Sequence, residues 1–313
     1  MSDGIGWFEF SFSDFSFAFL SILLEGAPFL LLGTIMSGLI DQFLPAKVMT
    51  RLLPRNAYAG AAVSGLLGFI FPMCECGVVP VIRRLMAKGL PVSNAVVYML
   101  SAPIVNVVVV LSTYAAFRNQ MPEWMTGLRL GVGYGVAVLT GMVVHNLSIK
   151  YVLRKNILAE ITQARGIEGG RRGGFGTRMA GALQVAVSDF LDMMVYFIIG
   201  CAAAATFSTA VNQEFVVPLA VSPALATFSM MGLAGILSLC STTDAFIAAT
   251  FVTFPAVSKL AFLVFGPMMD VKLIFIYSSV FRKRFVLGMV VGLFILVGLI
   301  CVRLSVVFLP GIE

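Results

Sequence analysis

Four long stretches of this chain contain no charged residue, and they constrain its fold more than any other feature. Each has about 18 residues or more, which lets a helix cross the hydrocarbon core of a bilayer. Only 12% of the 313 residues are charged, whereas soluble domains carry about 25%. Because no alternating β-barrel pattern is present, we predict an all-α polytopic membrane protein. The charge-free stretches are Asn56–Cys74, Gly89–Phe117, Met193–Gln213 and Phe285–Val302.

The two halves of the chain carry similar polar residues and prolines at similar places. Near-constant separations of such rare residues indicate an internal duplication. We therefore predict a first membrane repeat over residues 1–149, a basic, glycine-containing linker over 150–178, and a second membrane repeat over 179–313. The matched pairs, each separated by 164 to 167 residues, are Glu25 with Asp192, Cys74 with Cys240, Pro103 with Pro267, and Asn106 with Asp270.

The basic residues predict that the two repeats insert in opposite directions. Lys and Arg concentrate in cytoplasmic loops. Arg83, Arg84 and Lys88 follow the cysteine-rich segment of the first half, whereas the matched stretch 249–254 has no charge. At another matched position the second half is the more basic one. Residues 282–284 are all basic, whereas their first-half counterpart 118–120 has one basic residue. We therefore expect inverted-topology repeats in the cell inner membrane, with a cytoplasmic linker and both termini extracytoplasmic.

Each half is expected to contain five apolar pieces, which gives about 8–10 hydrophobic segments in the chain. The third pieces, Gly77–Met86 and Ala245–Phe254, are too short to span a bilayer and predict re-entrant hairpins. The fourth pieces, Val92–Phe117 and Ala256–Phe281, are expected to break at their prolines. Gln42–Pro54 is interpreted as a helix that lies along the membrane interface. The remaining expected pieces are Phe15–Ile40, Tyr58–Phe71, Leu128–Ser148, Phe190–Val211, Val216–Leu239 and Phe285–Val307.

Matched breaks in two repeats are typical of the central binding site of a transporter. We expect one pair of breaks at 72–77 and 238–243, and a second pair at Ser101–Pro103 and Gly266–Pro267. Polar residues gather at these breaks, and intramembrane charges usually serve function. A structural ion pair is the alternative for the lysine among them. The candidate coupling residues are Glu75, Asp244, Asp270 and Lys272.

Thiols occupy the same breaks. Cys74 and Cys76 flank Glu75, and Cys240 matches Cys74 in the second half. Soft sulfur ligands prefer thiophilic partners such as Cu(I), Zn(II) or trivalent arsenic. The candidate substrate-binding residues are therefore Cys74, Cys76, Asn106, Cys240 and Thr242.

The other cysteines and the single histidine are given structural roles. Cys201 and Cys301 lie inside plain apolar segments, where free cysteine usually fills space. His145 lies far along the chain from the candidate thiols. We expect no catalytic residue, no cofactor and no resident metal ion.

The segment FPMCECGVVPVIRRLMAKGLPVSNAVVYMLSAPIVN, with LCSTTDAF and GPMMD in the second half, resembles the predicted-permease family that includes the ArsP organoarsenical efflux permeases. The resemblance covers nearly the whole chain. It implies export of trivalent organoarsenicals such as methylarsenite across the inner membrane, coupled to an ion gradient. It also implies contact with arsenic at Cys74, Cys76 and Cys240.

The sequence therefore predicts a secondary transporter, not an enzyme, that exports small thiophilic solutes. Proton antiport is the expected drive, with Glu75, Asp244 or Asp270 as the carrier. A permease for a soft metal ion or for a sulfur or selenium compound is the alternative. A membrane thiol oxidoreductase is a weaker rival, because the sequence has no CxxC motif. The expected partners are the small-molecule substrate and the lipid bilayer, not nucleic acid, and a homo-oligomer is left open.

Overall fold

The computed structural model is helical and contains no strand in the residues that it describes, which are 12–45, 48, 54, 56–70, 73–166, 174–210 and 222–308. Five described segments are long and apolar enough to cross a membrane: α1, α7, α10, α15 and α13 taken with α14. Helices α5 and α6, bent by 41°, make a sixth if the pair is one span. This confirms the predicted all-α polytopic fold. The helices are α1 (Phe12–Phe43), α3 (Ala57–Ile70), α4 (Val78–Ala87), α5 (Val92–Val105), α6 (Val107–Ala116), α7 (Pro122–His145), α8 (Ile149–Val152), α9 (Lys155–Gly166), α10 (Phe175–Ala210), α11 (Pro223–Leu237), α12 (Asp244–Thr250), α13 (Ala256–Met268), α14 (Val271–Val280) and α15 (Lys283–Phe308).

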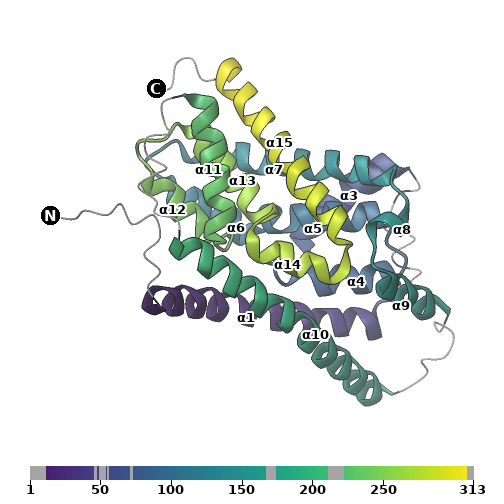
Figure 1. Cartoon of the computed structure of the whole chain (residues 1–313). Helices are drawn as coiled ribbons and strands as arrows, with labels where there is room; N and C mark the ends of the chain where they lie inside the picture. Colours follow the sequence, from purple (N-terminus) through teal and green to yellow (C-terminus); the bar gives the residue numbers. More distant parts are fainter. Residues whose placement is uncertain are drawn as a thin grey trace.

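The order of the helices is the same in both halves. A long helix, a helix of medium length, a short helix, a broken pair and a final long helix occur as α1, α3, α4, α5–α6 and α7. The same order returns as α10, α11, α12, α13–α14 and α15. Helices α1 and α10 pack side by side (Figure 1). They run antiparallel, because Gly26 meets Phe197 while Gly38 meets Ala182. Inversion of the two complete halves stays a prediction.

The first pair of breaks lies where the sequence predicts it. Helix α3 ends at Ile70 and α4 begins at Val78, while α11 ends at Leu237 and α12 begins at Asp244. Helices α4 and α12 contain 10 and 7 residues. At about 1.5 Å per residue they are too short to cross a bilayer. The non-helical segments between the paired helices carry the candidate thiols.

The second pair of breaks does not lie at the prolines. Pro103 and Pro267 lie inside α5 and α13, and the helices end two residues and one residue after them. The breaks lie instead at polar residues that cap the next helix. Asn106 accepts a hydrogen bond at 3.0 Å from the N–H two residues later, and Asp270 accepts one at 2.6 Å from the N–H three residues later. A proline near the end of a helix removes a single backbone bond. The caps set the boundary because they satisfy free N–H groups.

Two further expectations concern the ends of α1 and α10. The predicted interface helix Gln42–Pro54 starts inside α1, and most of it lies outside the described residues. Helix α10 begins at Phe175, within the predicted linker 150–178. The linker also contains α9 and most of α8, whereas residues 167–173 lie outside the described part of the chain.

Arg83 and Arg84 lie inside the expected third apolar piece of the first half, on α4. Arg84 forms hydrogen bonds of 3.0 and 2.5 Å with the buried carboxylate of Asp189 on α10. Ser37 on α1 donates to the same carboxylate at 2.7 Å. Arg83 lies 3.6 Å from the exposed Asp192. These contacts hold α4, and with it the Cys-Glu-Cys segment, against the two long helices.

Glycines let the long helices reach the backbone of the candidate site. A Cβ at Gly33 on α1 would lie 2.5 Å from the Cα of Gly77 and closer still to its carbonyl oxygen. A Cβ at the matched Gly200 on α10 would lie 2.9 Å from the carbonyl oxygen of Lys272. Small residues permit such close backbone contact between membrane helices. Both contacts position a break.

Gly33→Ala is expected to lower the unfolding temperature of the purified protein in detergent, because its Cβ would force α1 away from Gly77. Overpacking of this kind costs about 1–3 kcal/mol, which exceeds or offsets the gain of about 1 kcal/mol in helix propensity. Gly131→Ala on α7 is the matched control, because a Cβ there meets nothing within 4 Å. Equal unfolding temperatures for the two variants would contradict the tight contact at Gly33.

Candidate functional site

A buried lysine joins the breaks of the two halves. Lys272 Nζ lies 3.4 Å from Glu75 Oε1 and 3.6 Å from Asp270 Oδ2. It also donates a hydrogen bond to the carbonyl oxygen of Ser238 at 3.3 Å. Glu75, Asp270 and Lys272 are 1%, 2% and 3% exposed. Charges buried this deeply need partners, so one cation ties the first-half break to both second-half breaks.

Arg129 on α7 extends this arrangement into one network. Its Nη2 lies 2.7 and 3.0 Å from the two carboxylate oxygens of Asp244 and donates to the Ser241 carbonyl oxygen at 3.1 Å. Its Nη1 donates to Thr113 at 2.6 Å. Ser241 Oγ in turn donates to Glu75 Oε2 at 3.1 Å. Arg129 is not among the site residues predicted from the sequence, although an arginine in an apolar segment is a signal of function.

This network contains more acidic than basic groups. Three buried carboxylates, Glu75, Asp244 and Asp270, face two buried cations, Lys272 and Arg129. With every group ionised, one negative charge is left over, and an uncompensated buried charge costs several kcal/mol. Among the described residues, Asp270 Oδ2 has no hydrogen-bond partner. The network can therefore hold one further cation, and a proton is the smallest.

The candidate thiols lie beside the network. Cys76 is 1% exposed, and its side chain is within hydrogen-bonding reach of the half-buried Cys74. Cys240 is buried and accepts a hydrogen bond from Thr242 Oγ1 at 3.6 Å. Glu75 separates the first two cysteines, and Ser241 follows Cys240 directly. Each thiol is therefore one residue along the chain from a member of the charged network.

The described part of the chain contains no group of three His, Cys, Asp or Glu side chains that could hold a metal ion.

Some predicted residues have other surroundings. Asn106 is buried, and within the described residues its side chain bonds only to the backbone at the start of α6. Glu25 accepts a hydrogen bond from Thr243 at 3.3 Å, so α1 also reaches the second-half break. Its match Asp192 lies beside Arg83 instead. Glu25 and Asp192, which occupy matched positions in the sequence, therefore contact different kinds of residue.

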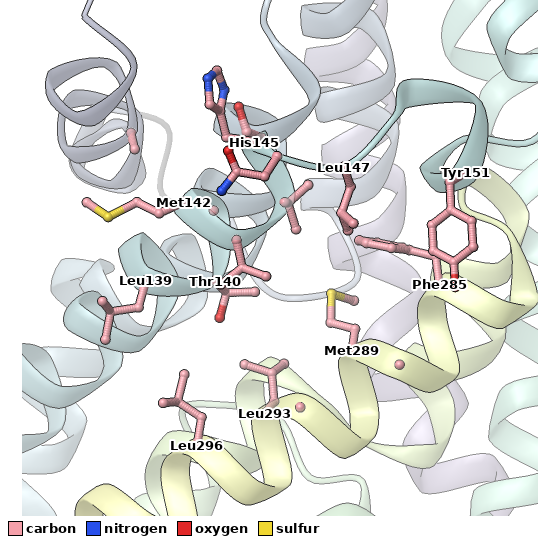
Figure 2. Close-up of a pocket in the computed structure, with 18 of the residues that line it drawn as sticks. Leu139, Thr140, Met142, His145, Leu147, Tyr151, Phe285, Met289, Leu293 and Leu296 are labelled. Atoms are coloured by element: carbon pink, nitrogen blue, oxygen red, sulfur yellow. The ribbon is translucent and has the colours of Figure 1, made fainter.

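The remaining cysteines and the histidine lie outside the charged network. Cys201 and Cys301 are fully buried in α10 and α15, as the space-filling interpretation expects. His145 is exposed at the end of α7 and lines a cavity of about 770 Å³ (Figure 2). None of the residues described as lining that cavity belongs to the charged network.

Comparison with known proteins identifies the family. A family profile named ArsP_1 and described as "Predicted permease" matches residues 11–308. The UPF0718 protein YcgR of Bacillus subtilis is 36% identical over 288 residues, which cover 92% of this chain and 95% of that protein. A Streptococcus mutans protein named "Putative two-component membrane permease complex subunit" is 34% identical over 278 residues, with 87% and 88% covered. No solved structure gives a significant match.

The family description and the name of the Streptococcus mutans relative both refer to membrane permeases, in agreement with the five or six candidate spans. They point to transport across a membrane. The family match extends over nearly all of the chain and includes both pairs of breaks. The chain therefore belongs to the predicted permease family.

Proposed function

We propose that this protein is a secondary transporter that exports small thiophilic solutes across the inner membrane, with trivalent organoarsenicals such as methylarsenite as its main substrates. One observation carries the proposal. Thiols from matched breaks of the two halves lie next to a shared, buried network that has one more carboxylate than cations. A thiophilic solute would bind the sulfur atoms, and a proton would bind the acids.

The binding step uses ordinary thiol chemistry. The thiol of Cys74 or Cys76 would attack trivalent arsenic, an As–S bond would form, and an As–OH bond would break. The thiol proton would leave with the hydroxide as water. Cys240 would make the second sulfur contact, with Thr242 and Asn106 near the remaining hydroxyl. Because Cys76 and Cys240 are buried, the two halves would have to move apart to admit the solute.

The coupling step would use the surplus carboxylate. A proton on Glu75, Asp244 or Asp270 would bring the network to neutrality and weaken that acid's hold on Lys272 or Arg129. Lys272 contacts groups at more than one break, and Arg129 joins α7 of the first half to Ser241 and Asp244 of the second. Releasing either cation would therefore loosen the join between the halves. Loss of the proton to the cytoplasm would restore it.

Substrate binding is tested by transport into inverted membrane vesicles, with methylarsenite, arsenite, zinc and cadmium compared side by side. Cys74→Ser and Cys76→Ser are each expected to lower methylarsenite uptake at least tenfold, because a hydroxyl binds arsenic poorly. Cys301→Ser, which alters a buried thiol in α15, is the control and should keep full uptake. Unchanged methylarsenite uptake in both serine variants would reject thiol contact, and transport of zinc alone would favour a soft-metal permease.

Proton coupling is tested by Glu75→Gln, Asp244→Asn and Asp270→Asn, made one at a time. The variant that lacks the carrier should lose proton-driven uptake at least tenfold and keep solute counterflow, because an amide cannot release a proton. Asp192→Asn, which changes an exposed carboxylate outside the network, should keep both activities. Proton antiport is excluded if all three network variants retain both proton-driven uptake and counterflow.

The proposed inverted repeats place the two termini outside and the linker in the cytoplasm. The antiparallel run of α1 and α10 supports this arrangement. Cysteines introduced as Ser2→Cys and Gly169→Cys should then react with an impermeant thiol reagent from opposite faces of the membrane. Both positions lie outside the described residues, and labelling of both from one face would contradict the topology.

The relative from Streptococcus mutans is named as a subunit of a complex. We extend this to the present chain as part of the proposal, with a second membrane component as an expected partner beside the solute and the lipid.

A further inference from the structure

The cavity that His145 lines lies apart from the charged network, between two membrane-spanning helices. It has a volume of about 770 Å³ and is enclosed mainly by the end of α7 and the start of α15. Figure 2 shows Thr140 on α7 across the space from Met289, Leu293 and Leu296 on α15. The walls are mostly apolar. This cavity is therefore suited to a hydrocarbon group.

The cavity changes from polar to apolar along its length. Arg284, His145 and Tyr151 line one end, whereas Leu139 and Leu296 line the other. Residues 284 to 296 of α15 extend about 18 Å at 1.5 Å per residue. That is slightly more than half of the roughly 30 Å hydrocarbon core. Because α15 begins at Lys283, the polar end lies near the membrane surface and the cavity reaches about the midplane, as a single lipid acyl chain does.

The polar end has the character of a site for an anionic head group. The described lining contains Arg284 and His145 and no acidic residue. Two tyrosines, Tyr58 and Tyr151, line the cavity as well, and tyrosine is enriched where membrane meets water. Arginine binds phosphate oxygens in paired hydrogen bonds. Basic pockets between membrane helices are known to hold anionic lipid head groups.

Two glycines give the cavity its depth. A Cβ at Gly288 or at Gly292, one helical turn apart on α15, would meet no atom within 4 Å, and both residues line the space. Such spacing also occurs where membrane helices pack.

We propose that this cavity binds one acyl chain of an anionic phospholipid, with the lipid phosphate held at Arg284. The site is separate from the proposed transport site, and its occupant comes from the bilayer. The lipid would fill the space between α7 and α15, the last spans of the two halves.

The test uses the full chain, purified and delipidated in detergent, then titrated with phosphatidylglycerol or phosphatidylcholine and followed by native mass spectrometry. The wild type should bind phosphatidylglycerol about tenfold more tightly than phosphatidylcholine. Both lipids offer a phosphate to Arg284, but the choline cation of phosphatidylcholine is repelled by the arginine. Arg284→Gln should remove this preference. Gly288→Leu combined with Gly292→Leu should abolish binding of both lipids and leave the lipid-free unfolding temperature unchanged, because the new side chains enter open space.

Two control variants separate the cavity from general effects. Gly135→Leu adds the same side chain to an open position on α7 that does not line the cavity. Lys283→Gln removes a neighbouring charge that also does not line it. Both should bind lipid as the wild type does. Equal affinity for the two lipids, binding that survives the double leucine variant, or equal losses in the controls would overturn the proposal. So would a second membrane protein that co-purifies with the wild type and is lost from the double leucine variant while lipid binding persists.

Discussion

The pairing of buried carboxylates with two cations is the interaction on which the candidate site depends. Lys272 contacts Glu75 and Asp270, and Arg129 holds Asp244 and the backbone of Ser241. Removing one partner from a buried pair costs about 3–5 kcal/mol, because the other charge is left buried and uncompensated. Each half therefore depends on the charges that the other half supplies. Protonation of one acid changes the same contacts without removing a side chain. The network can thus be both a structural join and the part that changes during transport.

The two halves share a framework and differ in their charges. Gly33 matches Gly200, and Asn106 matches Asp270 as the cap of the second half of a broken helix. Lys272, however, falls where the first half has Val108, at the same separation as the caps. If the halves are repeats, as the matched separations predict, they share the positions of their breaks and differ in where the lysine stands. This explains why the contacts of matched residues differ.

Much of the architecture could be predicted because it follows from local chemistry. The charge-free runs predict the spans formed by α5 with α6, by α10 and by α15. The run Asn56–Cys74 was expected to cross as well, but it forms only the 14-residue α3, and the Cys-Glu-Cys segment follows that helix. The sequence also placed Lys272 near a carboxylate of the breaks, since an unpaired lysine is costly there. The position of the second breaks was wrong, because a proline weakens a helix over a turn while the cap residue decides where it ends.

Other features depend on tertiary contacts that no local pattern contains. Arg84 has the sequence context of a loop charge, and only the fold brings Asp189 from 105 positions away to meet it. Arg129 likewise finds Asp244 across 115 positions. In both cases the sequence shows a basic residue at the edge of an apolar segment. Whether it faces water or a buried acid depends on which helix packs against it.

The placement of the thiols gives the proposed mechanism a direct link between its two steps. Releasing arsenic from sulfur requires a proton on the departing sulfur and a hydroxide, from water, on the arsenic. Glu75 lies one residue from both Cys74 and Cys76 along the chain, and Cys240 is followed by Ser241, which donates a hydrogen bond to Glu75. A proton that arrives to neutralise the surplus charge would therefore arrive where the As–S bond has to break. The same proton would then loosen the ion pairs and favour release, so neither step would proceed far without the other.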